Sequence, residues 1–347
     1  MKKRNMILTI TAIVVLVLLL FIANNTLDSY ILRILNLCAI YTILGLSMNL
    51  INGFTGLFSL GHAGFMAVGA YTTALLTMSV STKQMNFFLK PITPFLENVV
   101  CPFLPSLILA GVFSTIIAIL IGAPVLRLKG DYLAIATLGF GEIIRVIFTN
   151  TQTVTNGALG LKSIPVTTNL YWSFGTAIVT IYILVSLINS SYGRAFKAIR
   201  EDEIAAESMG ISLFKHKVLS FAIGAFFAGI GGGLLGNLIG AIDPLMFRFT
   251  TTYNILLIIV LGGMGSVTGT IISAFIITIA QEALRFLDEQ MFASIPALPG
   301  LRMVVFSILL MVVVLFFRNG LMGTREFSWD KLLIKPLAKG GTKNERA

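Results

Sequence analysis

The chain is a series of long apolar runs separated by short polar segments. A helix needs about 20 apolar residues to cross the hydrocarbon core of a membrane. Runs of about that length predict ten membrane-spanning helices, near residues 6–24, 31–51, 59–80, 103–126, 131–149, 171–190, 217–240, 251–264, 267–287 and 300–317. The eighth and ninth spans are separated only by LGGMGSVTG at 261–269, which has no charged residue. We therefore predict an all-α fold, a polytopic membrane helical bundle.

Composition supports a membrane protein and excludes other classes. The chain is 56% hydrophobic and 12% charged, whereas soluble domains carry about 25% charged residues. Its formal charge of +10 invites a nucleic-acid interpretation. However, the basic residues lie in short segments between apolar runs, not clustered with aromatic residues on one face. We therefore expect no nucleic-acid partner. Cys38 and Cys101 are the two cysteines, and they imply no disulfide framework.

The basic residues also predict how the spans are oriented. The opening MKKRN precedes an apolar run that is longer than a signal-peptide core and lacks an A-x-A site, so we expect an uncleaved first helix. With the N-terminus in the cytoplasm, 17 of the 25 Lys and Arg residues lie inside, as the positive-inside rule requires. Both termini are then cytoplasmic, and residues 150–170 lie outside. We expect a transmembrane domain over 1–320 and a basic cytoplasmic tail over 321–347.

Glycine is concentrated in NGFTGLFSLGHAGFMAVGAY at 52–71. Each glycine inside a helix costs about 1 kcal/mol relative to alanine, so the segment needs a reason to keep them. One reason is the close approach of neighbouring helices, and another is a broken helix that lines a transport path. Both remain open. The candidate residues are Gly53, Gly56, Ser59, Gly61, His62, Gly64 and Gly69, with Gly262, Gly263 and Gly265 of the second glycine-rich segment.

His62 is an ionisable residue at the start of an apolar span. Such a residue can serve in a proton relay or as a ligand, or its neutral ring can hold a backbone group at a helix start. No second histidine, cysteine or carboxylate lies near it in sequence, and a metal site needs several such ligands. We favour the structural role and expect no metal.

Residues 193–216 form the long charged segment between spans. Asp202 is placed to cap a short helix that ends at Gly210, and Ser212 is placed to cap the following span. This predicts two short cytoplasmic helices, with the apolar residues Ile204, Ala205 and Met209 on one side. The segment is either a docking surface for a cytoplasmic partner or a solvated loop.

Two acid–base pairs lie three residues apart near the outer ends of spans. Glu142 and Arg145 belong to the fifth span, and Glu282 and Arg285 to the ninth. This spacing suits ion pairs on a helix surface, although the pairs could also line a gate. The chain has no G-x-x-x-x-G-K-[ST], G-x-S-x-G or H-E-x-x-H motif. We therefore expect neither catalysis nor a cofactor bound by this chain.

Four segments together resemble the LivM-type permeases of ABC importers for branched-chain amino acids. They are GFTGLFSLGHAGFMAVGAY at 53–71, LKGDYLAIATLGFGEIIRVIF at 128–148, AAESMG at 205–210 and LGGMGSVTG at 261–269. The resemblance extends over roughly residues 30–320. TNGALGL at 155–161 is similar to the family's TGG-x-x-GL segment, with Asn156 in place of the first of two adjacent glycines.

The resemblance implies a type II-like ABC importer permease with glycine-interrupted helices in the inner membrane of a prokaryote. Its partners would be a second, LivH-type permease, two cytoplasmic ATPases that bind ATP and Mg²⁺, an extracytoplasmic solute-binding protein, and membrane lipid. AAESMG is similar to the core of the importer coupling loop, and the usual leading Glu is Ile204 here. The coupling residues would be Arg200, Asp202, Glu203, Ala205, Ala206, Glu207 and Gly210.

The resulting expectation is a transport subunit that imports leucine, isoleucine or valine by alternating access, driven by its ATPase partners. A permease of the same family for urea or short amides is an alternative. An ion-coupled secondary transporter is a further alternative, and it would need intramembrane carboxylates or carbonyl sites, for which candidates are few. A lipid-processing enzyme would need a clustered polar active site, which the sequence lacks.

Overall fold

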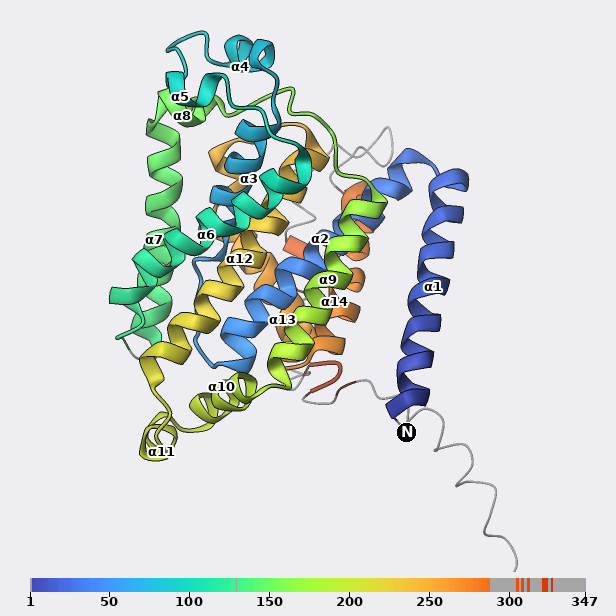
Figure 1. The fold of residues 1–347 in the computed structure, drawn as a ribbon, viewed down its shortest axis with the longest axis vertical. Coiled ribbons are helices and arrows are strands. Elements are labelled where there is room, and N and C mark those ends of the chain that lie inside the picture. The colour runs from blue at the N-terminus through green and yellow to red at the C-terminus, as the bar shows by residue number, and fades with distance from the viewer. Residues whose placement is uncertain are drawn as a thin grey trace, which may run out of the picture.

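The computed structural model describes residues 2–128 and 130–287, together with 304–305, 307–308, 311–312, 320–323 and 326. Within these residues the chain is helical, apart from turns, loops and an isolated β-bridge between Leu161 and Ile242. The all-α prediction is confirmed. The longer helices form a bundle (Figure 1) and are α1 (Lys2–Thr26), α2 (Ser29–Asn49), α3 (His62–Thr77), α6 (Phe103–Val125), α7 (Asp131–Asn150), α9 (Leu170–Ile188), α12 (Leu213–Ile239), α13 (Phe249–Gly262) and α14 (Val267–Ala283).

Short helices lie at the two ends of the bundle (Figure 1). One end, here called the α4–α8 end, carries α4 (Val80–Asn86), α5 (Pro94–Glu97), α8 (Gln152–Thr155) and the 3-10 turn η2 (Gly157–Leu159). The opposite end, the α10–α11 end, carries α10 (Ser191–Glu201), α11 (Glu203–Ser208) and the start of α1. Two further 3-10 turns, η3 (Pro244–Phe247) and η4 (Leu284–Leu287), follow α12 and α14.

Several helices are long and apolar enough to cross a membrane. Five such segments are Ser29–Phe54, Phe103–Val125, Asp131–Asn150, Leu170–Ile188 and Leu213–Ile239, and shorter apolar helices cover Val14–Thr26, Phe249–Gly262 and Val267–Ala283. The protein is therefore a multi-pass membrane protein. The predicted number of ten spans stays a prediction, because the span at 300–317 lies mostly outside the described residues.

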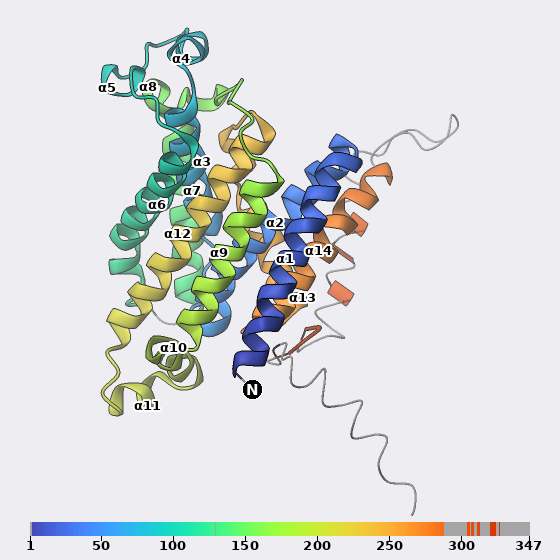
Figure 2. The same ribbon diagram turned by 45° about the vertical axis from the view of Figure 1, so that its right-hand side comes forward.

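The centre of the bundle is α12, which packs against α2, α3 and α6 (Figures 1 and 2). Most of α2 and α12 is buried, whereas α6, α7 and α9 keep broad exposed faces. Large apolar side chains lie on those faces, among them Leu120, Ile135 and Tyr182. Apolar residues on the outside of a helix bundle are expected where its surroundings are hydrocarbon instead of water.

The predicted third span, 59–80, is not one continuous helix. After α2 the backbone widens into a π-helical turn, η1 (Leu50–Phe54), and residues 55–61 are non-helical before α3 begins at His62. The 16 residues of α3 are fewer than the roughly 20 that a complete crossing requires. Residues 55–61 therefore supply the remaining part of this span as irregular backbone.

A buried lysine fastens the loops at the α4–α8 end. Lys83 of α4 is 0% exposed, and its ammonium donates hydrogen bonds to the carbonyls of Leu96 (2.7 Å) and Val99 (2.6 Å). Burial lowers the pKa of Lys83 from its usual value. The cost of burying the charge is offset by these charge-assisted hydrogen bonds, which hold α5 and the residues after it against α4.

Candidate functional site at the broken helix

The non-helical segment 55–61 is stabilised by side chains from the surrounding helices. The amide of Asn52 bridges the backbone of Ser59, donating to its carbonyl (3.2 Å) and accepting from its N–H (3.3 Å). The hydroxyl of Thr137 on α7 accepts from the N–H of Leu60 (3.0 Å). Irregular backbone at membrane depth requires such protein partners, because hydrocarbon offers none.

The start of α3 is held by two further side-chain contacts. Thr252 of α13 accepts a hydrogen bond from the N–H of Ala63 (2.9 Å). The Nε2 atom of His62 is 2.8 Å from the hydroxyl of Ser47 on α2, and His62 is buried. The ring of His62 therefore ties α3 to α2, which fits the structural interpretation. Sequence alone did not identify Ser47, Asn52, Thr137 and Thr252. Thr137 and Thr252 are far from the break in sequence, and nothing in the residues around Ser47 and Asn52 shows which groups they bond.

Glycines near the break allow backbones to approach closely. A Cβ at Gly61 would lie 2.6 Å from the carbonyl oxygen of Thr137, and one at Gly64 would lie 3.1 Å from the Cα of Gly141. A Cβ at Gly69 on α3 would lie 2.4 Å from the Cα of Gly229 on α12. These three positions therefore serve the packing of α3 against α7 and α12.

Asn49 joins the end of α2 to the connection between α13 and α14, residues 263–266. Its amide donates to the carbonyl of Ser266 (2.9 Å) and to the hydroxyl of Thr270 (2.8 Å), and its Oδ1 accepts from the N–H of Gly265 (2.9 Å). Gly263 and Gly265 both have positive φ, a conformation that glycine adopts at little cost. The two glycine-rich segments of the sequence thus meet in space.

Arg200 of α10 contacts the same place. Its Nη1 atom donates to the carbonyl oxygen of Gly53 (3.0 Å), and the side chain lies against Gly56 and Gly265, where a Cβ would have no room. Gly56 also has a positive φ of 75°. The ammonium of Lys197, one helical turn before Arg200, lies 5.9 Å from the centroid of the Phe54 ring. Helix α10 is therefore in direct contact with the π-helical turn that precedes the break.

The predicted short helix that ends at Gly210 is present as α11. The Oδ1 atom of Asp202 accepts from the N–H groups of Ile204 (2.8 Å) and Ala205 (3.0 Å). At the other end Gly210 has a φ of 83°, as a left-handed helix stop requires. Lys217 of α12 forms an ion pair with Glu203, which fastens α11 to the bundle.

Two details of the charged segment differ from the prediction. Ser212 precedes α12, but its side chain makes no capping hydrogen bond; instead its carbonyl lies 2.8 Å from Nδ1 of His216. Ala206 was grouped with the coupling residues, yet it is buried and therefore cannot present its methyl group to another subunit. Ile204 and Met209 are 74% and 83% exposed, and Ala205 and Glu207 are also exposed.

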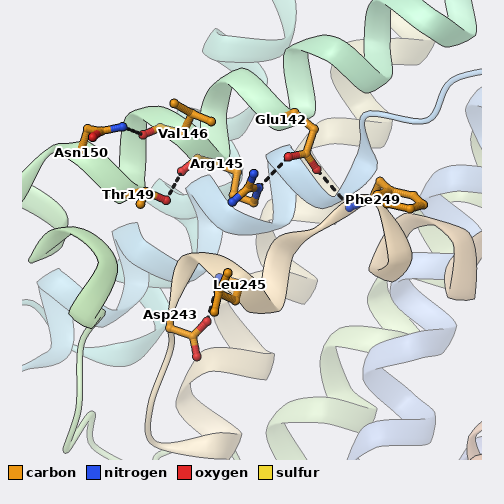
Figure 3. A network of polar contacts seen from close by, with 8 residues as sticks. All are labelled: Glu142, Arg145, Val146, Thr149, Asn150, Asp243, Leu245 and Phe249. Carbon is orange, nitrogen blue, oxygen red and sulfur yellow. Dashed lines mark hydrogen bonds and ion pairs between the residues drawn. The ribbon is translucent and has the colours of Figure 1, made fainter. Parts of the chain in front are cut away.

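The acid–base pairs are formed as their spacing predicts. The Oε2 atom of Glu142 is 2.6 Å from Nε of Arg145 (Figure 3). Its Oε1 atom accepts from the N–H of Phe249 (3.3 Å), the first residue of α13, so this carboxylate also links α7 to α13 (Figure 3). Glu282 of α14 pairs with Arg285 of η4 (3.1 Å) and accepts from the hydroxyl of Tyr30 (2.9 Å).

A cavity of about 490 Å³ lies between α2, α12, α13 and α14. Its polar lining includes Arg33 of α2, Asn254 of α13 and Glu282 of α14, and its apolar lining includes Leu37 and Leu257. The cavity is large enough for a small solute. In the part of the chain that the structure describes, no group of three His, Cys, Asp or Glu residues could hold a metal ion.

Comparison with known proteins identifies a family. Residues 30–315 match the model of the family "Branched-chain amino acid transport system / permease component". The high-affinity branched-chain amino acid transport system permease protein LivM is 34% identical in both Salmonella typhimurium and Escherichia coli. Those alignments cover 72% and 74% of this chain and 62% and 64% of the relatives. The chain thus matches less than two thirds of either relative's length.

The sister permease is less similar. The LivH permease protein of Salmonella typhimurium is 24% identical, over 70% of this chain and 80% of that protein. No solved structure matches the chain. The identities therefore favour the LivM type over the LivH type, in agreement with the LivM-type resemblance of the sequence.

Proposed function

Because the chain belongs to the branched-chain amino acid transport permease family, we propose that it is a membrane subunit of an ATP-driven importer for leucine, isoleucine or valine. The observation that carries this proposal is the match over residues 30–315, together with 34% identity to two LivM permeases. ATP hydrolysis would take place on separate ATPase subunits. The other partners are a LivH-type permease and an extracytoplasmic solute-binding protein.

The membrane in this proposal is the inner membrane of a prokaryote. The α10–α11 end faces the cytoplasm, where the ATPases bind, and the α4–α8 end faces outward. The positive-inside distribution of Lys and Arg supports this orientation. The N-terminus and the charged segment 193–216 lie at the same end of the bundle, as the orientation requires (Figure 1).

The ATPase contact would be made by α11. Its exposed apolar residues Ile204, Ala205 and Met209 form a surface that a cytoplasmic partner would cover, since exposed apolar patches mark interaction sites. Movement of α11 and α10 would reach the transmembrane helices through Arg200, which is bonded to the Gly53 carbonyl. The break at 55–61 is the place where α2 and α3 can change their relative arrangement. Alternating access would follow from that change.

The exposed face of α7 supports a contact with the second permease or with the translocation path. Glu142 and Arg145 have side chains 30% and 22% exposed on this face, which otherwise carries apolar residues such as Ile135 and Ile143. Charged groups that face hydrocarbon are costly. The pair is therefore better accommodated against protein or water than against lipid.

The cavity between α2, α12, α13 and α14 favours an amino acid over urea or a short amide. Arg33 suits a carboxylate, and Glu282, which also pairs with Arg285, suits an ammonium group. Leu37 and Leu257 suit an apolar side chain. Urea has neither charges nor an apolar side chain to use such a lining. A secondary transporter has no specific observation in its favour.

The test is uptake by the reconstituted complex. The chain is purified with its LivH-type partner and both ATPases, placed in liposomes, and supplied with solute-binding protein and radioactive leucine. We expect uptake that requires enclosed ATP and is inhibited by excess isoleucine or valine but not by urea. Uptake that follows an ion gradient without ATPases would overturn the proposal, as would ATP-dependent uptake of urea alone.

A further inference from the structure

A carboxylate from the C-terminal part of the chain lies at the start of α14. A helix leaves its first four N–H groups without partners inside the helix. At α14 the side chain of Ser266 accepts from the N–H of Gly269 (3.0 Å). The carboxylate of Glu326 accepts from the N–H groups of Val267 (2.6 Å) and Thr268 (3.0 Å), and from the Thr268 hydroxyl (2.6 Å).

The contact of the Glu326 carboxylate with the N-terminus of α14 is electrostatically favourable. A negative charge at a helix N-terminus is stabilised by the helix dipole, and hydrogen bonds to an ionised acceptor are stronger than those between neutral groups. Glu326 is 58 to 59 residues away from its partners in sequence. The contact therefore joins two distant parts of the chain.

Residues 320–322 are attached to the end of α13. The N–H of Leu321 donates to the carbonyl of Leu261 (2.7 Å), and that of Met322 donates to Gly262 (3.3 Å). Gly320 has a φ of 67° and lies so close to Gly263 that a Cβ would clash with its backbone. The segment is thus bonded to α13 on one side of the connection 263–266, while Glu326 is bonded to α14 on the other.

The connection between those two attachments is the one that Asn49 and Arg200 contact. Gly265 donates to Asn49 at the end of α2, and Arg200 of α10 lies directly beside Gly265. A shift of the connection would therefore displace the surface against which Arg200 and the π-helical turn are packed. A fixed connection therefore keeps the positions of α10 and α2 relative to each other unchanged.

We propose that Leu321, Met322 and Glu326 form a C-terminal clamp that fixes the α13–α14 connection, so that movement of α10 is passed to α2. Glu326 is the positioning residue of this clamp. The effect of the clamp on transport rests on the proposed function. The clamp itself consists of contacts within this chain alone.

The decisive variant is Glu326→Gln in the full chain, because it keeps the shape of the side chain and removes its charge. The amide has a single acceptor oxygen, so the Val267 and Thr268 amides cannot both be satisfied as before. The matched control is Glu97→Gln, which removes a carboxylate at the α4–α8 end, where it accepts a hydrogen bond from Gln84 (2.9 Å).

Two measurements are made on each variant. The first is hydrogen exchange of the Val267 and Thr268 amides in the purified chain, which needs no partner. We expect Glu326→Gln to exchange about tenfold faster at these two amides, and Glu97→Gln to leave them unchanged. Unchanged exchange in Glu326→Gln would overturn the clamp, whatever the protein transports.

The second measurement is leucine transported per ATP hydrolysed by the reconstituted complex. We expect Glu326→Gln to lower this ratio about fivefold or more while ATP hydrolysis by the assembled complex stays within about twofold of the wild type. A variant that merely misfolds would lower transport and hydrolysis together. Faster exchange with an unchanged ratio would show that the clamp has no part in coupling and would overturn that step.

Discussion

The contact between α3 and α12 at Gly69 gives a prediction whose size follows from the structure. A Cβ at Gly69 would lie 2.0 Å from the carbonyl oxygen of Gly229 and 2.4 Å from its Cα. Carbon atoms attract best at about 3.5–4.0 Å, so the two helices would have to separate by more than an ångström. Gly229 cannot move away freely, because a Cβ built on it would already be 2.7 Å from Cβ of Ser114 on α6.

We therefore expect Gly69→Ala to lower the free energy of unfolding by about 1–3 kcal/mol, the usual cost of overpacking a core. The matched control is Gly175→Ala on α9, where a Cβ would meet no atom of the described residues within 4 Å. There the substitution removes the helix penalty of glycine and should stabilise by about 0.5–1 kcal/mol. The two alanine variants should consequently differ by about 1.5–4 kcal/mol.

The assay is unfolding of the purified chain in mixed micelles of mild detergent and dodecyl sulfate, followed by far-ultraviolet circular dichroism. Each variant is compared with the wild type at the same lipid and protein concentrations. Equal unfolding free energies for the two variants would refute the close-packing account of the glycine-rich segment. Loss of stability in Gly175→Ala alone would refute it as well.

Three further predictions concern the two ends of the bundle. Ile204→Asp should leave the chain inserted but greatly reduce co-purification of the ATPase, whereas Met85→Asp, equally exposed but at the α4–α8 end, should not. Lys83→Met should increase hydrogen exchange over residues 94–101, because the Leu96 and Val99 carbonyls lose their donor; unchanged exchange would show that Lys83 does not hold the loop. In a chain without native cysteines, a membrane-impermeant maleimide should label Lys162→Cys but not Met209→Cys in intact cells, and the reverse pattern would invert the proposed orientation.

The parts of the fold that sequence could predict are those with a local cause. Long apolar runs identified the helices, because any helix in hydrocarbon needs them. The Asp202 cap and the Gly210 stop of α11 were predicted because each acts on residues within a few positions of itself. The Glu142–Arg145 pair follows in the same way from three-residue spacing on one helix.

The glycine-rich stretch indicated that the helix of the third span could be broken, but not where the break lies or which side chains satisfy its backbone. Its backbone is satisfied by Asn52, Thr137 and Thr252, and the last two are far away in sequence. Hydropathy counts apolar residues and cannot detect such distant partners. The predicted third span therefore began at residue 59, whereas α3 begins at His62. The same limit hid the burial of Ala206 and the contact of Glu326 with α14.

The hydrogen bond from Arg200 to the Gly53 carbonyl joins α10 to the π-helical turn, beside the contact of Lys197 with Phe54. Arg200→Gln removes the charged donor of this bond, together with the ion pair of Arg200 with its neighbour Glu201. Hydrogen bonds to charged groups contribute about 1.5–3 kcal/mol, which corresponds to a tenfold or greater loss of coupling. The matched control is Arg194→Gln, on the same helix, whose exposed side chain contacts only the nearby Ser191 among the hydrogen bonds of the described residues. The decisive measurement is leucine uptake per ATP hydrolysed by the reconstituted complex. The account predicts a ratio at least about tenfold lower for Arg200→Gln and an unchanged ratio for Arg194→Gln. A wild-type ratio for Arg200→Gln would contradict it.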